Sequence, residues 1–180
     1  VEMSVAADGS LYPVPIGSFR QANTAINLQI GNWIASRLSE NSHITELFAG
    51  SGNFSRTLLK SSPKQLSAVE IEQRAAEHWL SAIAPRYPAA RVTVADAGRI
   101  ALPLTTETAL VDPPREGLKY FLCKAFLEHA SLSEIFYVSC NPKPLAADLA
   151  TLTHPAHPKR FAVIGVAAAD MFPQTHHVET

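Results

Sequence analysis

The stretch ITELFAGSGN, from Ile44 to Asn53, decides the fold of this 180-residue chain. It begins as a short apolar run, which is typical of a buried strand, and it ends in a Gly-x-Gly turn. Residues 54–59, which follow directly, predict a helix. A glycine turn between a strand and a helix lets a ligand approach the backbone closely. The third glycine of the dinucleotide-binding pattern is absent, so this loop alone predicts a ligand only weakly.

The same alternation of strand and helix continues along the chain. Further short apolar strands are predicted at 65–70, 92–95, 109–111, 135–138 and 161–166. Helices are predicted between them at 72–84, 120–129 and 145–152. Strands that alternate with helices favour an α/β fold with a mostly parallel, twisted sheet and helices on both faces.

The first forty residues do not follow this alternation. Residues 11–16 are punctuated by prolines and predict an extended segment, and residues 23–38 predict an amphipathic helix. The apolar face of that helix is expected to hold Ile26, Ile30, Trp33, Ile34 and Leu38. We therefore expect an N-terminal extended segment and capping helix over 1–40, and the sheet domain over 41–180.

Composition excludes several classes of protein. Hydrophobic residues make up 47% of the chain and charged residues 17%, which is enough apolar material for a core and too little charge for disorder. The net charge of −1 supplies no global positive field for nucleic acid. Two cysteines cannot build a disulfide framework or a four-thiolate metal site. The sequence shows no membrane-spanning run and no signal peptide, and it therefore favours a cytoplasmic location.

Acidic residues end two of the predicted strands. Glu70 ends the second strand and Asp96 follows the third. A glycine loop followed by acids on the next two strands suggests a cofactor that contains adenosine. An acid at the end of the second strand can hold ribose hydroxyl groups, and one at the end of the third can meet the adenine amino group. Capping of the following helix is the alternative interpretation for each acid.

Two proline-containing turns follow the later strands. The turn at 112–115 begins with Asp112, whose carboxylate two prolines would fix at the end of a strand. The turn at 139–142 holds Cys140, where a thiol near a helix N-terminus could act as a nucleophile or be a spectator. Cys123 lies within a predicted helix and is expected to be a buried hydrophobic residue.

The C-terminal stretch 170–180 contains a histidine pair and an acid. The adjacent residues His176 and His177 do not face the same way in regular structure, and no cysteine or acid stands at ligand spacing, so a zinc site is not expected. Glu179 is a candidate general base, with a surface carboxylate as the alternative.

In this order and spacing, these motifs resemble the catalytic domain of the RNA (uracil-5-)-methyltransferases, which use S-adenosylmethionine. The resemblance runs from about residue 18 to 179. It rests on SFRQAN at 18–23, ELFAGSGNFS at 46–55, VE at 69–70, DPPREG at 112–117, YVSCNP at 137–142 and DMFPQTHHVE at 170–179.

The resemblance implies a Rossmann-like class I methyltransferase fold and a set of site residues. Cys140 matches the nucleophile that adds to carbon 6 of uracil, and Glu179 matches the general base. Gln21 and Asp112 match positions near the target base as well as the cofactor. Together with Gly50 of the glycine loop, the residues implied to line the S-adenosylmethionine pocket are Gln21, Phe48, Asn53, Glu70, Asp96 and Asp112.

The resemblance also implies the partners. The substrate would be a flipped-out uridine in tRNA or rRNA, and the protein would be a monomer with no metal in this region and no membrane attachment. The family's N-terminal RNA-binding domains and iron–sulfur cysteines have no counterpart in the chain, and the sheet is expected to lack the family's final antiparallel strand.

Two other functions stay open at this point. One is methylation of an amino nitrogen of a nucleobase, for which a strand ending in Asp-Pro-Pro followed by an aromatic residue is typical; here Arg115 stands in that place. The other is a cofactor-binding fragment without catalytic activity.

Overall fold

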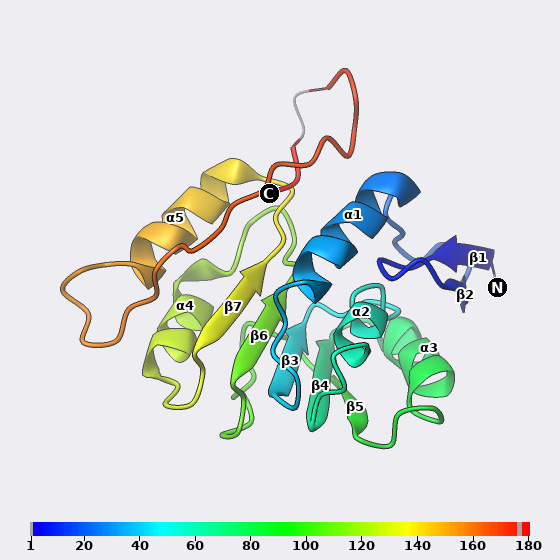
Figure 1. Cartoon of the computed structure of the whole chain (residues 1–180), viewed down its shortest axis with the longest axis horizontal. Helices are drawn as coiled ribbons and strands as arrows, with labels where there is room; N and C mark the ends of the chain where they lie inside the picture. The colour runs from blue at the N-terminus through cyan, green and yellow to red at the C-terminus, as the bar shows by residue number, and fades with distance from the viewer. Residues whose placement is uncertain (1, 176–177) are drawn as a thin grey trace.

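The computed structural model describes residues 2–175 and 178–180. Its centre is a five-stranded sheet in the order β5-β4-β3-β6-β7, in which all four neighbouring pairs are parallel. The strands are β3 (His43–Leu47), β4 (Gln65–Glu70), β5 (Ala90–Val94), β6 (Thr108–Val111) and β7 (Glu134–Tyr137). Because the strands are parallel, their carboxyl ends all lie at one edge of the sheet (Figure 1). The predicted α/β class is confirmed.

Helices cover both faces of the sheet. On one face lie α1 (Thr24–Ala35), α2 (Ser55–Leu59) and α3 (Gln73–Ile83), and on the other lie α4 (Lys119–Glu128) and α5 (Pro142–Leu152) (Figure 1). Side chains alternate along β3, so Ile44 joins the cluster under α1–α3 and Leu47 joins the cluster under α4 and α5. Both faces are therefore buried, which explains why these strands are nearly continuous apolar runs.

The strand predicted at 161–166 is wrong. Phe161 N donates to Leu152 O, and within the part of the chain that the structure describes residues 162–168 make no backbone hydrogen bond. A groove of about 960 Å³ separates β7 from residues 161–169, and Ile164 is 90% exposed. The apolar, β-branched composition was the right signal for a strand, but an extended segment becomes one only where a partner backbone lies within hydrogen-bonding distance.

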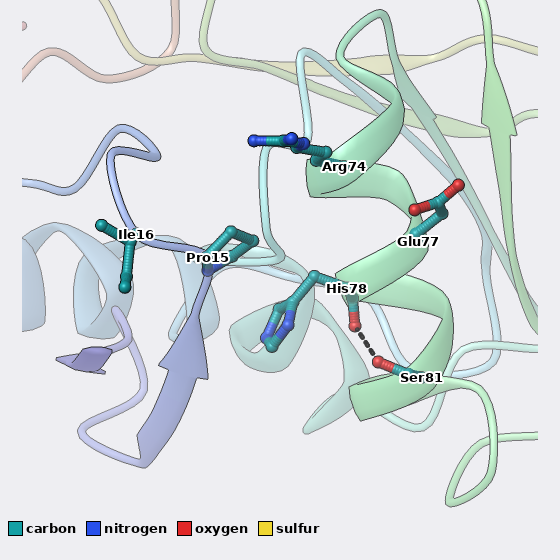
Figure 2. Close-up of a pocket in the computed structure, with 6 residues that line it drawn as sticks. All are labelled: Pro15, Ile16, Arg74, Glu77, His78 and Ser81. Atoms are coloured by element: carbon teal, nitrogen blue, oxygen red, sulfur yellow. Dashed lines mark hydrogen bonds between the residues drawn. The ribbon is translucent and has the colours of Figure 1, made fainter. Parts of the chain in front are cut away.

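A two-stranded antiparallel hairpin precedes the first helix. It consists of β1 (Glu2–Val5) and β2 (Leu11–Val14), with Val5 paired to Leu11. The segment that leaves β2, with Pro15 and Ile16, lies against the outer face of α3, where His78 and Ser81 line a shallow depression of about 430 Å³ (Figure 2). The sequence predicted the extended segment after residue 11 and missed its partner strand.

The hairpin fixes the position of α1 through a close backbone contact. A Cβ atom on Gly31, in the middle of α1, would lie 1.9 Å from the carbonyl oxygen of Ala7. The buried stripe of α1 is accordingly Asn27, Gly31 and Ile34, whereas the predicted residues Ile30 and Trp33 are only partly buried. Among the described residues, no helix is long and apolar enough to cross a membrane.

Replacing Gly31 by alanine should destabilise the protein. The added methyl group meets backbone atoms that cannot rotate away, so overpacking at a cost of about 1–3 kcal/mol should outweigh the helix-propensity gain of about 1 kcal/mol. Urea unfolding followed by circular dichroism measures the difference. The exposed neighbour Asn32→Ala is the control and should stay within about 0.5 kcal/mol of the parent. An equally stable Gly31→Ala protein would contradict this packing.

Candidate active site at the carboxyl edge of the sheet

The two glycines of the loop after β3 are needed for different reasons. Both have positive φ, 55° at Gly50 and 92° at Gly52. A Cβ on Gly52 would lie 2.5 Å from Ile83 Cδ1, so this glycine lets the loop pack against α3. A Cβ on Gly50 would meet nothing within 4 Å, so its backbone borders open space. Gly50 is thus the position where a ligand can reach the main chain.

Glu70 ties the glycine loop to the start of α3. Its Oε2 accepts a hydrogen bond from Gly50 N and its Oε1 accepts one from Glu72 N, both at 2.7 Å. Asp96 has a more local role, because its Oδ1 accepts from Gly98 N at 2.9 Å and its Oδ2 pairs with Arg99 at 3.3 Å. These contacts stabilise turns, and neither acid is a helix N-cap, since the N-cap of α3 is Glu72. Cofactor binding by either acid stays a prediction.

Asn53 faces α1 and the hairpin. Its Oδ1 accepts from Ala7 N at 3.0 Å and from Asn27 Nδ2 at 2.9 Å, and its Nδ2 donates to Asn27 Oδ1 at 3.0 Å. The predicted cofactor residue therefore also joins three separate segments of the chain. Asn27 is fully buried and was missed by the sequence analysis; a polar residue in the middle of an apolar helix face was the available signal.

Phe48, directly after β3, has a left-handed backbone with a φ of 63°. This conformation is strained for a bulky residue, and such strain is concentrated at functional sites. Its half-buried side chain packs against the cluster under α4 and α5, while the following loop turns toward α2 and α3. The strained residue therefore lies where the chain changes direction at the carboxyl edge.

A buried carboxyl group lies beneath this loop. Glu46 is 1% exposed and accepts a hydrogen bond from Ser55 Oγ, which in turn accepts one from Trp79 Nε1 at 2.6 Å. Burial raises the pKa of Glu46 to about 8, with further upward contributions from Asp112 and Glu70 that the Ser55 hydrogen bond only partly opposes. The sequence analysis did not select Glu46, although an acid inside an otherwise apolar strand was a visible signal.

The titration of Glu46 should make the protein less stable as the pH rises. Its carboxyl is protonated in the folded state up to about pH 8, whereas its ordinary pKa is 4.5, so folding takes up a proton between these values. Stability should fall across this window, with Glu46 contributing roughly 1 kcal/mol per pH unit. Glu46→Gln keeps an oxygen for Ser55 and should show a shallower fall in urea unfolding between pH 5 and pH 8. Identical slopes for the two proteins would contradict a protonated Glu46.

The end of β6 meets the segment before α1. Gln21 Nε2 lies 3.5 Å from Asp112 Oδ2, which brings together two predicted site residues that are far apart in the chain. Burial raises the pKa of Asp112 to about 7, and the charge of Glu179 adds to this effect. Asp112 therefore faces the C-terminal tail as well as Gln21.

The tail returns to the sheet beside Cys140. Ser139 and Thr180 exchange two backbone hydrogen bonds of 2.8 Å, and Ala169 and Glu179 exchange two more, of 2.8 and 3.0 Å. These contacts place the buried Glu179 next to the residue that precedes Cys140. Burial raises the pKa of Glu179.

Cys140 is half-buried and lies within the field of these acids. Its thiol pKa is raised by burial and by the charges of Glu179 and Asp112, and the Arg115 guanidinium opposes this shift. One edge of the molecule therefore gathers a thiol, two carboxyl groups and a cation. Cys123, in contrast, is buried inside α4, and burial together with Asp148 raises its pKa to about 12.

Asp148 of α5 fixes the two turns that hold Asp112 and Cys140. Its Oδ2 accepts from Leu118 N and from Tyr137 Oη, both at 2.8 Å, and its Oδ1 lies 3.7 Å from Cys123 Sγ. Leu118 ends the turn that begins at Asp112, and Tyr137 ends β7 shortly before Cys140. This buried carboxylate was missed because its three donors come from distant parts of the sequence.

Removal of the Asp148 carboxylate should destabilise the protein strongly. Asp148→Ala leaves three buried donors without an acceptor, which should cost about 3 kcal/mol in urea unfolding. Tyr137→Phe removes only one of these donors and should cost about 1 kcal/mol. The exposed acid Glu116 provides the matched control, and Glu116→Ala should be neutral. A loss for Asp148→Ala no larger than that of Glu116→Ala would contradict the assigned role.

Within the described residues, no group of three or more His, Cys, Asp or Glu side chains could hold a metal ion. The histidine pair at 176 and 177 lies outside the described residues.

The family follows from comparison with known proteins. Residues 69–180, from the end of β4 through the Cys140 turn to the tail, match the family model described as tRNA (Uracil-5-)-methyltransferase. The chain belongs to this family. The resemblance drawn from the sequence motifs is confirmed.

Relatives of this family include tRNA and rRNA enzymes. The chain is 31% identical over 200 residues to the tRNA/tmRNA (uracil-C(5))-methyltransferase of Musicola paradisiaca, covering 98% of this chain and 51% of the relative. It is 35% identical over 175 residues to the 23S rRNA (uracil(1939)-C(5))-methyltransferase RlmD of Halomonas elongata, covering 90% of this chain and 35% of the relative. The chain thus spans about half the length, or less, of these curated relatives.

The fold matches a solved structure of the same family. The tRNA (uracil-54, C5)-methyltransferase of Pyrococcus abyssi, in complex with S-adenosyl-L-homocysteine, superposes with a TM-score of 0.79 at 27% identity. The match covers 96% of this chain and 41% of that one. The predicted Rossmann-like methyltransferase fold is therefore confirmed.

Proposed function

We propose that this chain is the catalytic part of an enzyme that transfers a methyl group from S-adenosylmethionine to carbon 5 of a uridine in tRNA or rRNA. The observation that supports this most directly is the convergence of Cys140, Glu179 and Asp112 at the carboxyl edge of the sheet. A thiol and a carboxyl group at one site are the two groups that methylation of this carbon requires.

The residues around the glycine loop fit S-adenosylmethionine. The backbone of Gly50 borders open space, and the Glu70 oxygens that accept from Gly50 and Glu72 keep lone pairs for ribose hydroxyl groups. The residues that would hold the cofactor are Gln21, Phe48, Gly50, Asn53, Glu70, Asp96 and Asp112. When bound, the cofactor supplies an electrophilic methyl group.

Cys140 would make the target carbon reactive. Carbon 5 of uracil is a poor nucleophile, and the Cys140 thiolate would add to carbon 6, forming a carbon–sulfur bond and moving electron density toward O4 as an enolate. Carbon 5 would then accept the methyl group as the donor's sulfur–methyl bond breaks, with S-adenosylhomocysteine as the leaving group. Glu179 would remove the proton from carbon 5, and the returning electron pair would break the carbon–sulfur bond and release Cys140.

The electrostatics of the site favour the base role of Glu179 and oppose formation of the Cys140 thiolate. The raised pKa of Cys140 means that its thiol must lose a proton before it adds, so the addition should become faster as the pH rises. The raised pKa of Glu179 suits a base that must hold a proton near neutral pH. Because Cys140 lies at a half-buried position, a uridine must leave its base stack to reach it.

A covalent adduct tests this mechanism. RNA that contains 5-fluorouridine has no removable proton on carbon 5 of the target, so after methyl transfer the bond to Cys140 should persist through denaturation. We expect an adduct that forms only when S-adenosylmethionine is present, seen as a shifted band in a denaturing gel. Cys140→Ser should reduce this adduct at least ~100-fold, because a hydroxyl is a far weaker nucleophile at neutral pH. Cys123→Ser is the matched cysteine control and should leave adduct formation intact.

Glu179→Gln tests the general-base role of Glu179 separately from the nucleophile role of Cys140. Without a base, carbon 6 cannot release sulfur after methylation, so this variant should accumulate an adduct even with ordinary uridine RNA while turnover falls at least ~100-fold. Full methyl transfer by Cys140→Ala would instead favour methylation of an amino nitrogen, and calorimetric binding of S-adenosylmethionine without any turnover would favour an inactive cofactor-binding fragment.

A further inference from the structure

Two neighbouring aromatic side chains project from the first turn of α4. Tyr120 is 66% exposed and Phe121 is 77% exposed, and their ring centroids lie 6.2 Å apart with the planes at 68°. The core contacts of α4 are made by other residues, namely Leu122, Cys123, Phe126 and Leu127. A pair of exposed aromatic rings indicates an interaction surface more strongly than a single exposed residue does.

The loop before this turn is held firmly beside Cys140. Asn141 Nδ2, in the residue after Cys140, donates to the carbonyl oxygen of Arg115 at 3.2 Å. Leu118 N donates to Asp148 Oδ2, and a Cβ on Gly117 would lie 3.0 Å from Pro144 Cβ. The aromatic pair therefore begins directly after a segment that is packed against the Cys140 turn. Its rings lie at the same edge of the sheet as the site.

Exposed cations lie on the segment that leads into the pair and on the neighbouring Cys140 turn and α5. Arg115, Lys119 and Lys143 are all exposed, and none of the three forms an ion pair within the described part of the chain. Glu116 is the one acid in the stretch between Arg115 and Phe121. The chain as a whole has a net charge of −1, and the excess of Arg115, Lys119 and Lys143 over Glu116 is a local positive charge that the composition does not show. The acids Asp112 and Glu179 lie at the same edge, on the Cys140 side.

We propose that Tyr120 and Phe121, with Arg115, Lys119 and Lys143, bind the unpaired nucleotides that flank the target uridine. This inference rests on the proposed function for its choice of ligand. Aromatic rings interleaved with cations fit single-stranded RNA, because bases stack on the rings while the cations contact phosphates. An apolar protein partner would need only the aromatic rings, and a purely electrostatic contact would need only the cations.

Binding of a fluorescein-labelled single-stranded oligouridylate, measured by fluorescence anisotropy, tests the surface separately from catalysis. The measurements use the Cys140→Ala protein, in which no covalent step can occur. Tyr120→Ala and Phe121→Ala should each weaken binding about tenfold, and the double variant should weaken it further. Tyr120→Phe keeps the ring and should bind like its parent. Leu104→Ala, which removes an 87% exposed apolar side chain elsewhere, is the control and should also bind unchanged.

Two further arms distinguish stacking from charge. The double aromatic variant should bind a blunt RNA duplex as well as its parent does, because paired bases offer no free face. Lys119→Ala should lower the salt dependence of binding by about one counterion for both RNAs.

The proposal is overturned if the double variant binds the oligouridylate like its parent, if single-strand and duplex binding fall equally, or if the parent shows no binding up to about 10⁻⁴ M. Loss of oligouridylate binding in the aromatic variants, together with a failed 5-fluorouridine adduct in the parent, would reject the proposed chemistry and keep this surface. A normal adduct in the parent together with unchanged oligouridylate binding in the aromatic variants would keep the proposed chemistry and reject this surface.

Discussion

The parallel alignment of β3, β4, β6 and β7 is the constraint on which the site depends. In this register Leu47 lies opposite Val69 on one side and Val111 on the other, and Val111 lies opposite Tyr137. The residues that follow these positions, including Phe48, Glu70 and Asp112, therefore lie at one edge of the sheet. Both faces of the sheet are covered by helices, so the edge is where polar groups can meet a ligand.

Buried carboxyl groups at this edge fall into two kinds. Asp148 has three donors and fixes the turns around it. Glu46, Asp112 and Glu179 form the other kind, and burial raises the pKa of each. Groups with perturbed pKa values are concentrated at functional sites, where destabilising a charge serves binding or proton transfer. The packing of the sheet and helices thus stabilises the molecule as a whole, while the carboxyl groups at this edge are held in an arrangement that is not optimised for stability.

The fold was largely predictable because each buried strand and helix has a local pattern. The strands at 65–70 and 109–111 and the helix at 72–84 agree with the structure to within two residues at each end. Predictions failed where a partner decides the outcome. Residues 161–166 have the composition of a strand without a neighbouring backbone, and β1 was missed because its partner β2 defines it. Likewise Asn27, which the apolar periodicity did not select, is buried through its contacts with Val5 and Asn53.

The sequence by itself determined the α/β class, the family and the short list of residues for the site, because glycine loops, strand-end acids and the Cys140 turn are local motifs. Only the tertiary structure decided which of them meet. Glu179 lies beside the Cys140 turn because the tail pairs with Ser139, Glu70 is held by backbone amides of the glycine loop and of its own turn, and Asp96 is held by its own turn. These outcomes depend on hydrogen bonds between segments far apart in the chain, or on the geometry of a turn once folded, and neither leaves a local periodicity to detect.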